Sequence, residues 1–175
     1  MRIRRLKIRS LADELLRNAN ISEPPVLIHK IAKSQGVRLF LQPFDGEMSG
    51  FIAQKDDNVV IGVNTSHAKV RQRFTIAHEL GHMLLHEQGE VHVDRKFHIK
   101  LRNNVSSQGV DPDEVEANLF AAEILMPKQF IDHDLQGISD VDLLDTEVID
   151  GLAERYDVST QAIMFRLVAL GYIKA

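Results

Sequence analysis

The chain has 175 residues, of which 44% are hydrophobic and 26% charged, with a formal net charge of -4 and no cysteine. This composition is typical of a globular protein with a buried apolar core, and it excludes disulfides and thiolate metal sites. No apolar run approaches the roughly 20 residues that a membrane-spanning helix needs, so we expect a cytoplasmic protein without membrane contacts. The amino terminus (1–9) is basic, but because the total charge is negative we do not expect direct nucleic-acid binding.

Hydrophobic periodicity, helix caps and turn residues divide the chain into short helices and strands. In chain order we expect helices over 10–18 and 26–35, strands over 37–41, 49–54 and 59–63, a long helix from 64–66 to His86, an edge strand over 97–101, and helices over 112–125, 127–135, 150–156 and 159–170. The last two helices resemble a helix-turn-helix pair, although a helical hairpin that covers the core is an equally good interpretation.

These elements predict an α+β fold. A small, mainly antiparallel three-stranded sheet would pack on the long helix, with further helices on either side, because short turns join the three strands. We expect a single domain over 1–175. Within it we separate amino-terminal helices (1–36), a central sheet and site (37–135) and a carboxy-terminal helical hairpin (136–175).

The long predicted helix contains the pattern H-E-x-x-H, formed by His78, Glu79 and His82. Residues four apart lie one turn above each other, so the two imidazoles point the same way and can bind one Zn²⁺. Glu79 then lies close enough to serve as a general base. His86 lies about 12 Å along the helix axis from His78, too far to share that ion, so we expect it either next to the ligands without binding the ion or exposed at the surface. Gly81 costs the helix about 1 kcal/mol relative to alanine, which indicates a close approach of the sheet or of substrate.

A catalytic zinc site needs a third protein ligand, and the predicted helix over 112–125 offers one. Glu114 and Asn118 are four residues apart and face the same way. Glu114 can bind the ion, while Asn118 accepts a ring N–H from a ligand histidine and so fixes its tautomer. Glu116 points roughly the opposite way and is the weaker candidate. We interpret Glu123 as an ordinary charge on the helix surface.

Two stretches carry a family resemblance. Residues 73–82 (RFTIAHELGH) and 114–127 (E-x-x-A-N-x-F-A-A-x-x-L-M-P) resemble the ImmA/IrrE family of metallopeptidases in sequence and spacing, over about residues 25–135. The resemblance implies a gluzincin-like zinc peptidase with His, His and Glu ligands and a glutamate base. It also implies a substrate, a helix-turn-helix repressor encoded nearby, whose cleavage releases prophage, mobile-element or stress-response genes.

We therefore predict an endopeptidase that binds one Zn²⁺ through His78, His82 and Glu114, uses Glu79 as its base, and cleaves such a repressor. Mn²⁺ or another divalent ion also suits these nitrogen and oxygen ligands. The alternative is a non-proteolytic module that binds a regulator, or a toxin-like component of a two-gene system, with a structural or vestigial metal site.

The sequence also suggests where a substrate peptide would lie. An extended peptide can add to a free sheet edge as an extra strand, and we expect that edge near 48–53. His98, in the polar segment between the two motifs, is one option for stabilising the oxyanion.

Overall fold

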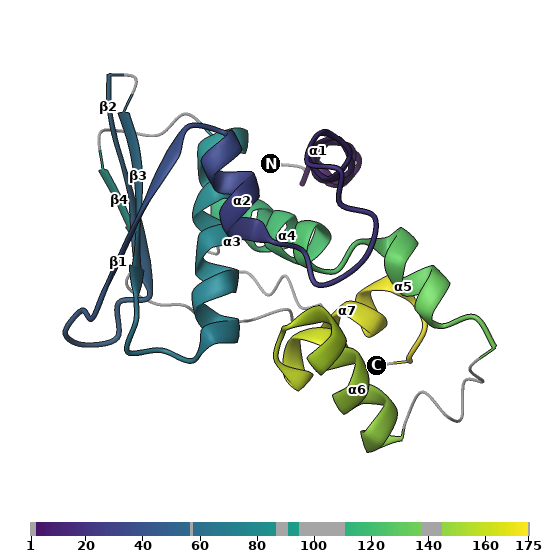
Figure 1. Ribbon diagram of the computed structural model, residues 1–175. Helices are drawn as coiled ribbons and strands as arrows, with labels where there is room; N and C mark the ends of the chain where they lie inside the picture. Colours follow the sequence, from purple (N-terminus) through teal and green to yellow (C-terminus); the bar gives the residue numbers. More distant parts are fainter. Residues whose placement is uncertain (1–2, 57, 87–90, 95–110, 138–144, 175) are drawn as a thin grey trace.

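The computed structural model describes residues 3–56, 58–86, 91–94, 111–137 and 145–174. In this part of the chain the helices lie on one side of a mixed sheet (Figure 1). The helices are α1 (Arg5–Asn18), α2 (Ile28–Ser34), α3 (Lys69–Leu85), α4 (Pro112–Leu125), α5 (Lys128–Asp134), α6 (Thr146–Tyr156) and α7 (Thr160–Leu170), and the strands are β1 (Val37–Gln42), β2 (Gly50–Lys55), β3 (Asn58–Asn64) and β4 (Val91–Asp94). The predicted α+β class is confirmed.

The sheet has the order β1-β3-β2-β4. β2 pairs antiparallel with both β3 and β4, whereas β1 pairs in parallel with β3. The sheet is thus mainly antiparallel, as expected, but it contains β4 in addition to the three predicted strands. Because β2 lies between β3 and β4, the prediction of a free edge for substrate near 48–53 is wrong. The predicted strand over 97–101 and His98 lie outside the described residues.

α3 is the central helix of the fold, packed against β2 and β3 on one side and against α2 and α4 on the other. A glycine lets β2 approach it closely, since a Cβ on Gly50 would lie 2.4 Å from the Thr75 methyl group. Apolar residues of α3 fill the space between the layers, and among them Ala77 and Leu80 are fully buried. The sheet and α4 therefore fix the position of α3 from two sides.

Gly81 marks the closest approach of α3 to α4. A Cβ at this position would lie 3.0 Å from Phe120 Cδ1 and 3.2 Å from Ala117 Cα. The sequence predicted a close approach of the sheet or of substrate, but the neighbour is a helix. Small residues at 117 and 121 allow this contact, and Glu114 lies on the same helix. The glycine therefore sets the spacing between the two helices that carry the H-E-x-x-H pattern and Glu114.

We expect Gly81→Ala to lower the free energy of unfolding by about 1 kcal/mol, because an overpacking cost of about 1–3 kcal/mol exceeds the gain in helix propensity. Gly151→Ala is the matched control. Gly151 lies inside α6 with no atom within 4 Å of a Cβ, so there alanine should stabilise by about 0.5–1 kcal/mol. Urea unfolding measures both variants. A Gly81→Ala protein more stable than the wild type would contradict the tight contact.

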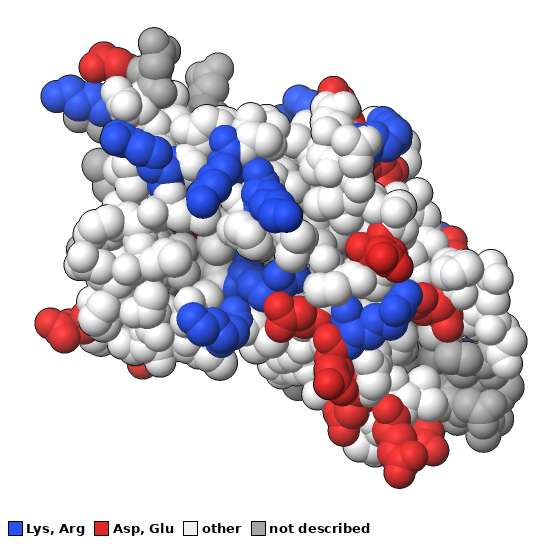
Figure 2. Space-filling view, in the orientation of Figure 1, with Lys and Arg blue, Asp and Glu red and all other residues white. Residues whose placement is uncertain are grey.

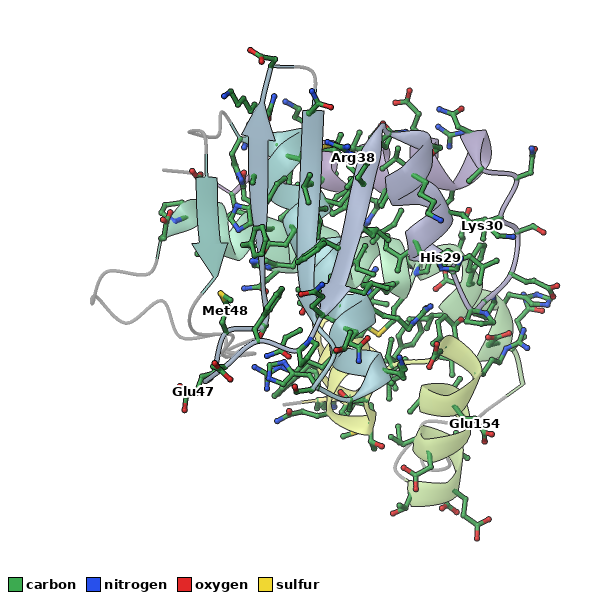
Figure 3. The ribbon with its side chains drawn as sticks, turned by 60° about the vertical axis from the view of Figure 1, so that its left-hand side comes forward. His29, Lys30, Arg38, Glu47, Met48 and Glu154 are labelled. Atoms are coloured by element: carbon green, nitrogen blue, oxygen red, sulfur yellow. The ribbon has the colours of Figure 1, made fainter. Side chains whose placement is uncertain are left out.

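Three helices begin about one turn away from the predicted residue, and one of them is α6, which starts at Thr146 instead of 150. α1 starts at Arg5, about one turn before 10–18, because its buried stripe already includes Ile8. α3 starts at Lys69, because Asn64 is used elsewhere: its side chain accepts from Phe44 N (3.0 Å) and donates to Met48 O (2.8 Å). Figure 3 shows Met48 in this loop, at the end of the sheet. Asn64 thus holds the β1–β2 loop instead of capping the helix.

The carboxy-terminal helices α6 and α7 pack together and join the core through buried polar contacts. Arg166 of α7 donates to Glu123 at 3.0 and 2.6 Å and to Met126 O at 2.9 Å, and both charged side chains are buried. The interpretation of Glu123 as a surface charge is therefore wrong. Arg73 of α3 donates to Asp157 O in the turn between α6 and α7. The helical pair thus covers the core.

Charge is unevenly distributed over the face drawn in Figure 2. Basic side chains gather over α2 and β1, where Lys30 and Arg38 are exposed, and acidic ones over α6, where Asp150 and Glu154 are exposed. The α6–α7 pair therefore presents carboxylates, whereas binding to nucleic-acid phosphates needs positively charged side chains.

Among the described helices, none combines the length and the apolar character that crossing a bilayer requires.

Candidate metal centre

α3 and α4 bring together three side chains of the kinds that bind metal ions. His78 and His82, one turn apart on α3, have their Nε2 atoms 3.0 Å from each other. Glu114, in the first turn of α4, lies with Oε1 3.1 Å from His82 Nε2 and Oε2 3.4 Å from His78 Nε2. One ligand atom from each of these residues lies within 4.8 Å of the other two. These are the residues that the sequence indicated as ligands.

The spacing of these atoms fits a single zinc ion. Zinc binds histidine nitrogen at about 2.0–2.1 Å in a tetrahedral arrangement, which places two ligand atoms about 3.3 Å apart. The measured separations of 3.0 to 3.4 Å surround that value. A His, His and carboxylate set is also one that catalytic zinc sites use, with the fourth position left for water. The residues present therefore fit the ion.

Neighbouring side chains orient the site. Asn118, one turn after Glu114, lies with Oδ1 3.1 Å from His78 Nδ1, as the sequence suggested. An amide oxygen only accepts, so in this contact His78 donates from Nδ1, which leaves Nε2 as the nitrogen that can bind a metal ion. Glu79 is fully buried beside the two histidines, whereas the Glu114 side chain is 34% exposed. Solvent therefore reaches the group through the Glu114 side.

A second set of polar contacts lies behind this group, and of its members the sequence indicated only His86. His86 Nδ1 lies 3.3 Å from His82 Nδ1, and His86 Nε2 lies 3.3 Å from Glu116 Oε2. Glu116 is buried and accepts from the backbone N–H and the guanidinium of Arg4. The hydrogen bonds from Arg4 lower the pKa of Glu116 to about 2. The signal for this pair in the sequence is weak, because Arg4 is one of several basic residues near the amino terminus and Glu116 lies 112 residues away.

Comparisons with known proteins agree with this geometry. The family model described as the IrrE N-terminal-like domain of Peptidase M78 matches residues 32–168, most of the chain. The chain belongs to the Peptidase M78 family. That assignment points to a peptidase and confirms the resemblance that the two motifs carried. A relative in Bacillus phage phi105, "Uncharacterized immunity region protein 2", is 28% identical over 120 residues, which are 69% of this chain and 68% of that protein.

A solved structure shares the fold of this M78 chain. It is a Mycobacterium tuberculosis transcriptional regulator, with a TM-score of 0.58 and 14% sequence identity. The match covers 93% of this chain and 47% of the regulator, so the chain spans about half the length of that protein. At this identity the match establishes similarity of fold alone.

Proposed function

We propose that this chain is a zinc-dependent endopeptidase that cleaves a helix-turn-helix transcriptional repressor. Cleavage would derepress phage, mobile-element or stress genes. His78, His82 and Glu114 hold the ion, which is Zn²⁺ or, with the same donors, another divalent ion such as Mn²⁺. Residues 1–175 form one metallopeptidase domain, which the continuous hydrophobic cluster from Ile8 to Ile173 supports.

One observation carries the proposal: three ligand atoms from two helices lie within 4.8 Å of one another, and the residue after the first of these histidines is a buried glutamate, Glu79. A structural zinc site is closed by four protein ligands, whereas a catalytic one leaves a position open. The group has three such residues among those described, and one of them, Glu114, is partly exposed. This donor set therefore favours catalysis over a structural role.

The mechanism assigns a proton transfer to Glu79. When bound, the ion supplies Lewis acidity, which acidifies a water molecule and polarises the scissile carbonyl. Glu79 accepts a proton from that water as its oxygen attacks the carbonyl carbon. The same carboxyl group then gives the proton to the amide nitrogen as the C–N bond breaks. One water is consumed, and Glu79 returns to its ionised form.

The names of similar proteins support a regulatory substrate. One is named for a phage immunity region, and the other is a transcriptional regulator. Phage immunity depends on repression of phage genes, so a peptidase in that setting has a repressor as its natural target. For this chain the candidate is the helix-turn-helix protein encoded beside its gene.

Co-expression with that neighbouring regulator tests the proposal. We expect the wild type to leave a clipped regulator in the cell, and His82→Ala, which lacks one ligand, to leave it intact. Purified wild-type protein should contain about one divalent ion per chain, because the three ligand residues form a single metal site. A regulator that co-purifies uncut with the metal-loaded wild type would support the non-proteolytic binding module instead.

A further inference from the structure

A chain of partly buried contacts connects the start of α1 with the H-E-x-x-H pattern. Arg4 Nε donates to Glu116 at 3.1 and 2.9 Å, and Arg4 Nη2 donates to Leu85 O, at the last residue of α3, at 3.0 Å. Figure 1 shows α1 beside α4, and the two helices are in contact. One guanidinium thus joins the beginning of α1, the end of α3 and the middle of α4.

The direction of each hydrogen bond follows from the groups present. The ionised Glu116 carboxylate has no proton to give, so His86 Nε2, 3.3 Å away, must be the donor. In the neutral ring, His86 Nδ1 then carries a free electron pair. His82 Nδ1 lies 3.3 Å from that atom and is the donor of the next bond. The proton of His82 is therefore on Nδ1, which leaves Nε2 as the nitrogen that can bind a metal ion.

The same protonation results on the other ligand histidine, where Asn118 accepts from His78 Nδ1. The Nε2 atoms of the two histidines lie 3.0 Å apart, beside the Glu114 carboxylate, where one cation can bind all three groups. The contacts outside the ligand set thus prepare both histidines to bind a cation.

A rival interpretation starts from His86, Asp113 and Glu116, whose ligand atoms also lie within 4.8 Å of one another. These residues could hold a second ion. The Arg4 guanidinium, however, already takes both carboxylate oxygens of Glu116. A divalent ion there would lie beside a fixed positive charge, which is electrostatically unfavourable. The geometry therefore favours hydrogen bonding over metal binding at this place.

We propose that Arg4, Glu116 and His86 form a positioning chain that holds His82 in the tautomer and ring orientation needed for metal binding. This inference rests on the proposed function of His78, His82 and Glu114 as ligands. Removing an outer hydrogen bond of this kind by mutation typically lowers metal affinity by about 10- to 100-fold. The sequence before α1 is therefore part of the metal site, although it is far from the pattern along the chain.

The first test measures Zn²⁺ affinity of the purified full chain by competition with a chromophoric chelator. We expect His86→Leu to weaken Zn²⁺ binding about 10- to 100-fold. His86→Gln should recover most of the loss, because the amide of glutamine accepts and donates at similar positions. Arg4→Met should weaken binding in the same direction. Arg5→Met is the matched control on an exposed neighbour and should leave affinity unchanged.

The second test reads the His82 tautomer directly. Imidazole ¹⁵N chemical shifts of the metal-free protein should show the proton of His82 on Nδ1 in the wild type and a mixture of tautomers in His86→Leu. This signal does not depend on activity or on bound metal. An unchanged His82 tautomer and unchanged Zn²⁺ affinity in a folded His86→Leu protein would overturn the positioning chain. A wild type that binds Zn²⁺ no better than His82→Ala would overturn the metal site itself.

Discussion

Replacing Glu79 by glutamine is expected to lower the rate of regulator cleavage by about 100- to 10,000-fold, the usual contribution of a general base. Glutamine has nearly the same shape but cannot accept the proton of the attacking water. Glu79 is fully buried next to His78 and is not one of the three ligands. The metal content of the variant should therefore match that of the wild type. Cleavage of the purified regulator, followed on a gel over time, gives the rate.

Glu154→Gln is the matched control for this experiment. Glu154 is exposed on α6 and points away from the body of the protein in Figure 3. The same chemical change there should leave both cleavage and metal content unchanged. A Glu79→Gln protein that holds its metal and cleaves at the wild-type rate would exclude the assigned mechanism.

The second large effect concerns stability. Arg166→Met should lower the free energy of unfolding by about 3–5 kcal/mol, the range seen when one partner of a buried ion pair is removed. The cause is the carboxylate left behind: the Glu123 side chain is 5% exposed and loses two hydrogen bonds from Arg166. Replacing both residues, as Arg166→Met with Glu123→Gln, should recover part of the loss. Chemical unfolding at neutral pH measures each variant.

The loss of unfolding free energy caused by Arg166→Met should also depend on pH. Burial raises the pKa of Glu123, but hydrogen bonds and charge from Arg166 outweigh it, so the pKa lies below its ordinary value of 4.5. A lowered carboxyl pKa contributes stability that is fully present above 4.5 and is lost as the pH falls through the folded-state value. The difference between wild type and Arg166→Met should thus narrow below about pH 4.

Lys128→Met is the control for this series. Lys128 and Asp132 pair on the surface, each 42% exposed, and such pairs contribute at most about 1 kcal/mol. A loss for Arg166→Met no larger than that for Lys128→Met would show that the buried pair adds little. Measuring both losses of stability at two salt concentrations distinguishes the two ion pairs further. Dissolved ions screen the exposed Lys128–Asp132 pair more strongly, so only its contribution should fall markedly at high salt.

The grouping of His78, His82 and Glu114 could be predicted because its information is local. A spacing of four on a helix places His78 above His82, and the same rule places Glu114 above Asn118. Asp111 marks the start of α4, where its side chain accepts from Asp113 N as a cap. Only the contact between the two helices had to be supplied by the fold, and the small residues of α4 were its visible signal.

The missed features all depend on partners far apart in the sequence. Arg166 reads equally well as a surface residue, and its buried pairing with Glu123 exists only once α7 packs on α4. The parallel pairing of β1 with β3 could not be predicted either. The alternation of residues along a strand shows which face of the sheet a side chain occupies, but it does not show which strand lies next to it. The edge at β2 was expected to be free because β4 was not predicted.

Mass spectrometry of the regulator after incubation with the metal-loaded chain in H₂¹⁸O shows directly whether this chain hydrolyses a peptide bond. Hydrolysis adds one water across the broken bond, so we expect two fragments whose masses add up to the intact protein plus that water. One ¹⁸O should be found in the new carboxyl terminus. An intact regulator bound to a chain that holds its metal would show that the chain is not a peptidase for this partner.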